Sequence, residues 1–269
     1  MTQPTLLFLY GTLRHLPLLT VVLGRMPEPV TATLHDHQVM RVKDETYPAI
    51  RAMDGGQADG LLLEVSEAEK ARLDYYEGAY HYALRSLSVE TDAGPRMAEV
   101  YFPTDAQPPA DGLWSLEEWS RLHGAAVTLA AQEVMSLMTS HTPDEVRWRY
   151  PSILTRAHSR LRAGVEPAPS AVRRGAGTVD IVEARQPYTG FFAVAEHDLR
   201  FGRFDGGQSG QVTRAAFLMG DAVTVLPYDP ARDRVLVIEQ FRFGPYMRGD
   251  LRPWSLEPVA GRIDPGEEP

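Results

Sequence analysis

A glutamate among aromatic residues is the best candidate for acid-base chemistry in the first half of the chain. The stretch LDYYEGAYHYALR runs from Leu73 to Arg85 and places Glu77 after a predicted helix, beside a glycine and four tyrosines. A carboxyl group in a partly apolar pocket has a raised pKa, which suits proton transfer near neutral pH. The alternative interpretation is a solvated carboxylate at a helix end. Asp74, about one helical turn earlier, is interpreted as a surface residue.

A second stretch of interest is FLYGTLR, in which Gly11 directly follows a predicted buried strand. A glycine at such a place allows either an unusual backbone angle or the close approach of a ligand to the backbone. On this stretch alone, a plain strand-to-turn glycine is the favoured interpretation.

The elements that must position these residues are short strands followed by helices. Runs of β-type residues separated by Gly or Asp-Gly predict strands at 5–11, 59–65, 83–91 and 98–102. Helices are predicted at 66–76 and from Ser115 to about Thr139, each opening with the S-x-x-E pattern of a capping box. A further helix starts at Thr142-Pro143, and Pro151 is expected to break or kink it.

A change of composition divides the chain. The segment 162–178, RAGVEPAPSAVRRGAGT, is rich in Pro, Gly, Ala and Arg and predicts a linker. After it the strand pattern returns, with a tight turn at Asp205-Gly206-Gly207 and a hairpin-like connection over 228–233.

We therefore predict three parts for the chain. They are a first domain over 1–110, a helical connection and linker over 111–177, and a second domain over 178–269. The last apolar run leads into GRIDPGEEP, which is typical of a strand that enters a turn.

Composition limits the classes of function. The chain has 269 residues, of which 43% are apolar and 23% charged, as in an ordinary soluble protein with room for two domains. A net charge of −9 opposes nucleic-acid phosphates, so we expect no nucleic-acid partner. The absence of cysteine excludes disulfides, thiolate metal sites and a cysteine nucleophile. The first apolar run, LLFLY, is too short to span a bilayer, so we expect no membrane partner and a cytoplasmic location.

The pairing of Y-G-T-L with L-D-x-x-E-G-x-x-x-Y-x-x-R resembles the γ-glutamylcyclotransferase-like, or AIG2-like, superfamily over about residues 5–102. The resemblance implies a small mixed β-barrel of the α+β class, with Glu77 as the acid/base and the turn Tyr47-Pro48-Ala49 lining the pocket. It also implies that backbone N–H groups of one loop bind the substrate's oxygens, at Tyr10, Gly11, Thr12 and Leu13. The family often has Ser at the position of Thr12, a difference that leaves the backbone role intact.

Such a domain would release 5-oxoproline from γ-glutamyl amides, by attack of the substrate's α-amine on its own γ-carbonyl. Members of the superfamily do not all share one substrate. The alternative is a non-catalytic ligand-binding or dimerisation module.

The second half carries a different resemblance. Gly261 and Glu267 have the spacing G-x5-E, with which the Nudix box G-x5-E-x7-R-E-U-x-E-E-x-G-U begins. Together with GDAVTVLPYDPARDRVLVIEQFRFGPY and PWSLEPVAG, the region from about Val179 onward resembles the ADP-ribose pyrophosphatase branch of the Nudix hydrolases, with which tellurite-resistance-associated proteins are grouped. This implies an α/β/α domain that hydrolyses ADP-ribose to AMP and ribose 5-phosphate with Mg²⁺. A homodimer formed through this domain is a further expectation.

The resemblance also implies roles for individual residues. Arg214 and Arg242 would bind the diphosphate, while Glu257 would accept a ribose hydroxyl or support the metal shell. The Ala260 carbonyl and Glu267 would be ligands of Mg²⁺. The alternatives are a surface strand arginine for Arg242 and a strand-end salt bridge for Glu257.

Most of the carboxylates of the Nudix box would follow Pro269. We therefore expect an incomplete domain, a fragment that is inactive as a Nudix hydrolase. Without the helix that would carry those carboxylates, strands at 223–226 and 235–238 should be partly uncovered. His35-Asp36-His37 has the look of a metal site, but we interpret it as a solvated surface pair at a strand edge.

Overall fold

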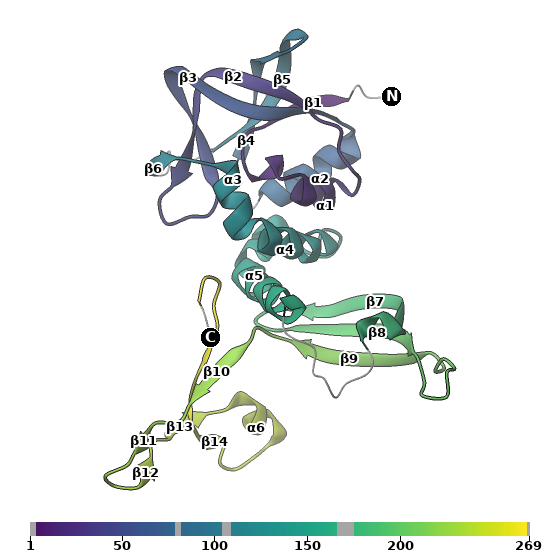
Figure 1. Ribbon diagram of the computed structural model, residues 1–269, viewed down its shortest axis with the longest axis vertical. Helices are drawn as coiled ribbons and strands as arrows, with labels where there is room; N and C mark the ends of the chain where they lie inside the picture. The colour runs from purple at the N-terminus through teal and green to yellow at the C-terminus, as the bar shows by residue number, and fades with distance from the viewer. Residues whose placement is uncertain (1–3, 79–81, 104–108, 166–174, 268–269) are drawn as a thin grey trace. The chain divides into compact units, whose positions relative to one another are not determined.

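The computed structural model describes residues 4–78, 82–103, 109–165 and 175–267 (Figure 1). The chain divides into two compact units, Met1–Glu166 and Pro167–Pro269. Among the described residues, no helix has both the length and the apolar character needed to cross a bilayer. The predicted linker at 162–178 lies partly outside the described residues.

The first unit is built on a closed β-barrel (Figure 1). Its strands are β1 (Thr5–Leu9), β2 (Val30–Val42), β3 (Pro48–Val65), β4 (Tyr82–Thr91) and β5 (Gly94–Pro103). They follow the order β3-β1-β5-β4-β2, and β2 pairs back onto β3, which closes the ring. The pairing of β1 with β5 is parallel and the others are antiparallel, so the predicted mixed barrel is confirmed. A short strand, β6 (Ala110–Leu113), pairs with β2 outside the ring.

Both faces of β1 are buried, which explains its uninterrupted run of apolar residues. Phe8 and Tyr10 belong to the cluster inside the barrel. Leu7 and Leu9 point to the opposite face and join a second cluster with the helices. The strand is thereby held from two sides, and the loop that follows it starts from a rigid position.

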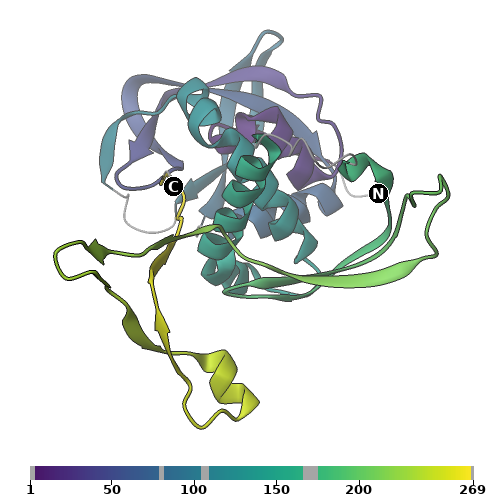
Figure 2. The ribbon, with the colours of Figure 1, turned by 60° about the horizontal axis from the view of Figure 1, so that its bottom comes forward.

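The helices cover one side of the barrel. They are α1 (Leu16–Leu23), α2 (Glu67–Gly78), α3 (Leu116–Trp119), the π-helical turn η2 (Ser120–Gly124), α4 (Ala125–Ser136) and α5 (Pro143–Val165). Side chains of α1, α2, α3, α4 and α5 share one apolar cluster with the outer face of the barrel. Figure 2 shows α4 and α5 side by side. We predicted the helices after residue 111 as a connection between domains, but they belong to the first unit, because their apolar faces pack against it.

The two helix starts that we predicted from a capping-box pattern are confirmed. The Ser66 backbone N–H donates to Glu69 Oε2 over 2.8 Å, and the Glu69 N–H donates to Ser66 Oγ over 3.4 Å. At α3 the Glu118 N–H donates to Ser115 Oγ over 3.2 Å. These short-range bonds satisfy N–H groups that a helix leaves unpaired.

A break or a kink was expected at Pro151, and the break is wrong, because α5 continues through this residue to Val165. The residues that follow are held by the helix's neighbours: Ile153 and Ala157 are buried in the core, and the buried Arg156 binds Glu133 of α4. Tertiary packing on this side outweighs the single backbone hydrogen bond that proline removes.

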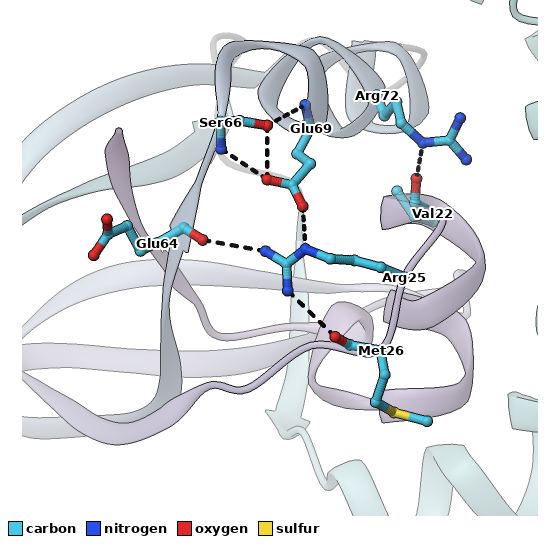
Figure 3. A network of polar contacts seen from close by, with 7 residues as sticks. All are labelled: Val22, Arg25, Met26, Glu64, Ser66, Glu69 and Arg72. Carbon is cyan, nitrogen blue, oxygen red and sulfur yellow. Dashed lines mark hydrogen bonds and ion pairs between the residues drawn. The ribbon is translucent and has the colours of Figure 1, made fainter. Parts of the chain in front are cut away.

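A polar network fixes the start of α2 against the end of α1 (Figure 3). The Arg25 guanidinium binds the Glu69 carboxylate and donates to the Met26 carbonyl oxygen over 3.2 Å. Arg72 Nε donates over 2.7 Å to the carbonyl oxygen of Val22 in the last turn of α1. Because α2 also carries Glu77, this network positions the helix on which the candidate catalytic carboxyl lies.

Helix α1 and strand β2 were not predicted. The helix has recognisable local signals, with Pro17 at its start and Gly24 in a left-handed conformation (φ 81°) at its end. Strand β2 is interrupted by a bulge at Asp36, whose backbone has φ 57°. The bulge breaks the simple alternation of side chains by which a strand is recognised.

The second unit consists of small antiparallel sheets. Strands β7 (Val179–Thr189), β8 (Ala193–Phe201) and β9 (Val212–Leu218) form one sheet. The other strands pair two by two: β10 (Ala222–Val225) with β15 (Val259–Arg262), β11 (Tyr228–Asp229) with β12 (Arg234–Val235), and β13 (Ile238–Phe241) with β14 (Trp254–Glu257). A short helix, α6 (Phe243–Arg248), follows β13. The predicted turn at 205–207 and the hairpin at 228–233 are confirmed.

The second unit buries little of its apolar surface. Among its described residues, only Thr189, Ala193 and Ile263 are buried. The predicted exposure of 223–226 and 235–238 is present in the structure, since Val225 is 57% exposed and Leu236 58%. A covering element for these strands stays a prediction.

Candidate functional site

A cavity lies at the end of β1, between the loop that follows this strand and the helices. It encloses about 660 Å³ of space not filled by atoms, part of which is open to solvent. Its walls come from the β1 loop, the start of β3, the end of α2, strands β4 and β5, and helices α3, α4 and α5. The lining residues include Tyr10, Gly11, Thr12, Leu13, Tyr47, Pro48, Tyr76, Glu77, Tyr82, Tyr101, Trp119, Val127 and Tyr150.

The loop after β1 forms a tight helical turn, η1 (Thr12–Arg14), at one end of the cavity. The Arg14 N–H donates over 3.0 Å to the Gly11 carbonyl oxygen, and Leu13 anchors the turn with a side chain that is 3% exposed. The first N–H groups of a helical turn have no partner within the turn, and no side chain caps this one. The loop therefore offers backbone donors to a bound anion or carbonyl oxygen.

Gly11 lies close to Pro48, the first residue of β3. A Cβ atom at position 11 would lie 3.2 Å from Cγ of Pro48. Such a contact is tighter than ordinary van der Waals packing, so a larger residue would have to displace Pro48 slightly. Tyr47 and Pro48 line the cavity, as the resemblance implied for their turn.

Glu77 lies in the last turn of α2 and is partly buried at the cavity wall. Within the described part of the chain, its carboxylate accepts no hydrogen bond. Burial raises the pKa of Glu77 from 4.5 to about 7. Near neutral pH, a carboxyl group with this pKa is present in both its protonated and its ionised form. A group that takes up a proton and then returns it needs both forms.

Tyrosine hydroxyls surround this carboxyl. Tyr10 and Tyr82 are hydrogen-bonded to each other, and burial, followed by the charge of neighbouring groups, raises the pKa of both. Tyr101 donates over 2.7 Å to Asp74 Oδ1. Burial and this hydrogen bond also raise the pKa of Tyr101, so these phenols stay protonated at neutral pH. Their hydroxyl groups are therefore neutral, in a cavity whose lining contains no lysine or arginine among the described residues.

The structure brings together the residues predicted for the first site, since Tyr10, the 11–13 loop and Glu77 line one cavity. Asp74, interpreted as a surface residue, has a side chain that is 43% exposed but is bound by Tyr101 and by Lys70 Nζ at 2.7 Å. Trp119, Val127 and Tyr150 were missed. They follow the barrel in sequence, and only the packing of α3, α4 and α5 places them at the cavity.

The residues predicted for the second site belong to the second unit. Arg242 and Glu257 form a two-bond ion pair, in which Arg242 Nε lies 2.6 Å from Glu257 Oε1. This pair lowers the pKa of the Glu257 carboxyl. Arg214 lies on β9 of another sheet and donates over 2.9 Å to the Thr213 carbonyl oxygen. The structure thus joins Arg242 to Glu257, and the ligand-binding roles of the three residues stay predictions.

The residues predicted as Mg²⁺ ligands do not by themselves suit this ion. Ala260 lies on β15, paired with Thr224. The Glu267 carboxylate accepts a hydrogen bond of 2.9 Å from the Asp264 backbone N–H and so closes a turn. Mg²⁺ prefers six oxygen ligands, several of them anionic. Among the described residues, no group of three His, Asp or Glu side chains is placed to hold a metal ion.

The His35-Asp36-His37 stretch has a structural role at the bulge of β2. Asp36 Oδ1 accepts a hydrogen bond of 2.9 Å from the Gly55 N–H, which ties the bulge to β3. His37 Nδ1 lies 2.8 Å from the His35 carbonyl oxygen, and its ring meets Phe102 edge-on at 5.6 Å.

Comparison with known proteins relates the chain to two kinds of relative. The sequence profile described as "Gamma-glutamyl cyclotransferase, AIG2-like" matches residues 7–121. AIG2-like protein B of Arabidopsis thaliana is 30% identical over 132 residues, which cover 48% of this chain and 77% of that protein. ADP-ribose pyrophosphatase of Escherichia coli K12 is 39% identical over 103 residues, which cover 38% of this chain and 49% of that protein.

The chain spans about half the length of the ADP-ribose pyrophosphatases that it matches. Among solved structures, the solution structure of an Arabidopsis thaliana protein is 25% identical, with a TM-score of 0.40, over 52% of this chain and 87% of that chain.

Proposed function

Because this chain belongs to the AIG2-like γ-glutamyl cyclotransferase family, we propose that its first unit releases 5-oxoproline from γ-glutamyl amides. The observation that carries this proposal is the cavity at the end of β1. It combines a carboxyl group with a pKa near 7 and a loop of backbone donors, and both are needed for an intramolecular amide transfer.

The substrate's α-carboxylate and γ-carbonyl oxygen would bind at the loop of residues 11–13. Backbone N–H groups there would hold the glutamyl group in a folded conformer, with its α-amine against its own γ-carbonyl. Holding this conformer replaces an encounter between molecules by a reaction within one molecule, which is worth several orders of magnitude in rate. The same donors would stabilise the negative charge that develops on the carbonyl oxygen.

Glu77 would move the proton. Its ionised carboxylate takes a proton from the α-ammonium group, and the free amine attacks the γ-carbonyl carbon. A carbon–nitrogen bond forms in the five-membered ring while the bond to the leaving amine breaks. The proton held by Glu77 passes to the leaving amine, and the ring nitrogen loses its second proton, which the departing amine takes up. The enzyme thus returns to its starting state, and the products are 5-oxoproline and the protonated amine.

The test is 5-oxoproline release from a panel of γ-glutamyl amides. We expect release by the unaltered chain and a loss of at least about 100-fold in Glu77→Gln, which keeps the shape of the side chain but cannot exchange a proton. In the unaltered chain, kcat/KM should rise with pH through about 7, as Glu77 ionises. Full activity in Glu77→Gln would refute the acid/base role. Inactivity of the unaltered chain on every amide would favour the alternative of a non-catalytic ligand-binding or dimerisation module.

We propose as a second function that the second unit is part of a Nudix-type ADP-ribose pyrophosphatase. Two observations support it: the resemblance of the region from Val179 onward, and the 39% identity over 103 residues to a protein named ADP-ribose pyrophosphatase. Arg214 and Arg242 would bind the diphosphate of ADP-ribose, for which Arg242 would have to exchange its contact with Glu257 for the ligand. Calorimetric titration with ADP-ribose, in the unaltered chain and in Arg242→Ala, tests this. Equal affinity, or no binding to either, would contradict the proposed role.

A further inference from the structure

A second cavity adjoins the candidate active site, behind two of its aromatic walls. It lies among α2, α4 and α5 and is lined by Tyr75, Tyr76, Val134, Val146 and Tyr150, with Pro143, Arg147 and Pro151 completing the wall. Tyr76 and Tyr150 also line the first cavity, so these two side chains stand between neighbouring spaces. A group attached to a ligand near Glu77 would reach this neighbouring space by passing between Tyr76 and Tyr150.

The lining of the second cavity indicates what that group would be. Apart from Arg147, its side chains are aromatic or aliphatic, and Val134 and Val146 are each 4% exposed. A carboxylate or ammonium group would lose its hydration there, whereas an apolar group would gain from leaving water. The chemistry of the wall favours an apolar side chain.

One polar group breaks this apolar wall. The Tyr75 side chain is 9% exposed, and its hydroxyl oxygen is buried without a hydrogen-bond partner in the described part of the chain. Burial, followed by the charge of Glu145, raises the pKa of Tyr75, so the hydroxyl stays protonated. A buried donor without a partner is costly, and a ligand oxygen in the cavity would remove this cost once the Tyr75 hydroxyl, which neighbouring atoms cover, turns toward it.

We propose that this second cavity binds the leaving amine, and that the preferred substrates are γ-glutamyl amides of apolar amines that carry a terminal oxygen for Tyr75. The proposal rests on the proposed cyclotransferase function. The γ-glutamyl group occupies the first cavity, the scissile amide lies by Glu77, and the amine's chain passes between Tyr76 and Tyr150. Tyr75 acts here as a specificity-determining residue that takes no part in proton transfer.

Three amides test this: those of methylamine, phenethylamine and 4-hydroxyphenethylamine. They differ only in the group that would enter the second cavity. The unaltered chain should prefer the 4-hydroxyphenethyl amide over the methyl amide by at least about 10-fold in kcat/KM. In Tyr75→Phe, the preference for the 4-hydroxyphenethyl amide over the phenethyl amide should fall by up to about 10-fold, with the methyl amide unchanged. No preference in the unaltered chain, or an unchanged ratio in Tyr75→Phe, would overturn the proposal.

A second variant fills the cavity. Val134→Phe should abolish the preference for the large amides while methyl amide turnover remains, and Leu129→Phe, on the same helix but outside the cavity, should retain the preference. An equal loss on all three amides would contradict the assignment, and if Val134→Phe does not fold, the Tyr75→Phe ratio decides.

If no amide yields 5-oxoproline, the cyclotransferase function fails, and calorimetry then tests the cavity alone. Tighter binding of the 4-hydroxyphenethyl amide than of the methyl amide, weakened in Tyr75→Phe, would support it, whereas equal binding would overturn it.

Discussion

The Tyr101 hydroxyl donates a hydrogen bond of 2.7 Å to Asp74, one helical turn before Glu77 on α2. Tyr101 lies on β5 of the barrel, so this bond joins the barrel wall to the helix that carries the candidate catalytic carboxyl. Lys70 binds the other carboxylate oxygen of Asp74 at 2.7 Å. Asp74 thus has a positioning role, which a solvated surface carboxylate would lack.

Tyr101→Phe should lower the free energy of unfolding of the first unit by about 1 kcal/mol, because it removes a hydrogen bond to a charged acceptor. Lys70→Met removes only the ion pair of the same Asp74 carboxylate, and it should lower the free energy of unfolding by less. Urea denaturation of both variants measures the difference. A larger loss in Lys70→Met than in Tyr101→Phe would show that the bond to β5 is not the main contact of Asp74.

The raised pKa of Glu77 predicts a pH-dependent cost to stability. The folded state holds this proton more tightly than the unfolded chain, whose carboxyl has a pKa of 4.5, so stability present below pH 4.5 is lost as the pH rises through about 7. At pH 8 the loss amounts to about 3 kcal/mol. The Glu77→Gln variant has no ionisable group at this position, so it lacks this pH-dependent loss of stability. The stability of the variant relative to the unaltered chain should therefore increase by this amount between pH 4 and pH 8, and a difference that does not change with pH would contradict the shift.

Gly11→Ala should disturb the loop that is proposed to bind the substrate. Its Cβ would meet Pro48 Cγ at 3.2 Å, so Pro48 would have to shift, which should cost about 1 kcal/mol of stability. KM for γ-glutamyl amides should rise. Gly164→Ala is the matched control, because a Cβ there has nothing within 4 Å and lies on α5, where alanine favours the helix. Equal behaviour of the two variants would mean that the contact with Pro48 does not matter.

Removal of the Arg25 guanidinium should destabilise the start of α2. In Arg25→Gln, the ion pair with Glu69 is lost, and the free energy of unfolding should fall by about 1 kcal/mol. The Arg25 hydrogen bond lowers the pKa of Glu69 to about 2, so the stabilisation is present above pH 4.5 and is lost as the pH falls toward 2. Denaturation of both proteins across pH 2 to 6 measures this, and parallel curves would exclude the pair as a source of pH-dependent stability.

ADP-ribose with Mg²⁺ should yield no AMP with the 269-residue chain. The reason is the set of metal ligands, since no cluster of three His, Asp or Glu side chains occurs among the described residues. The Escherichia coli ADP-ribose pyrophosphatase serves as a positive control. Mg²⁺-dependent release of AMP by this chain, abolished in Glu267→Gln, would establish a metal site that the described side chains do not form.

Local patterns in the sequence predicted the parts of the structure that depend on a few neighbouring residues. The caps at Ser66 and Ser115 were predicted because their hydrogen bonds span three residues. The strand before Gly11 and the helix before Glu77 were predicted for the same reason. The Tyr-Gly-Thr-Leu motif and Glu77, which the family resemblance singled out, line the same cavity.

Contacts between distant residues decided the rest. The return of β2 onto β3 closes the barrel, and the burial of Ile153 and Arg156 allows α5 to continue past Pro151. Trp119 and Tyr150 reach the cavity only because α3 and α5 pack on the barrel, and no local pattern in the sequence predicts this packing. The pKa of Glu77 likewise depends on how far the fold removes its carboxyl from water, which no spacing of residues along the chain specifies.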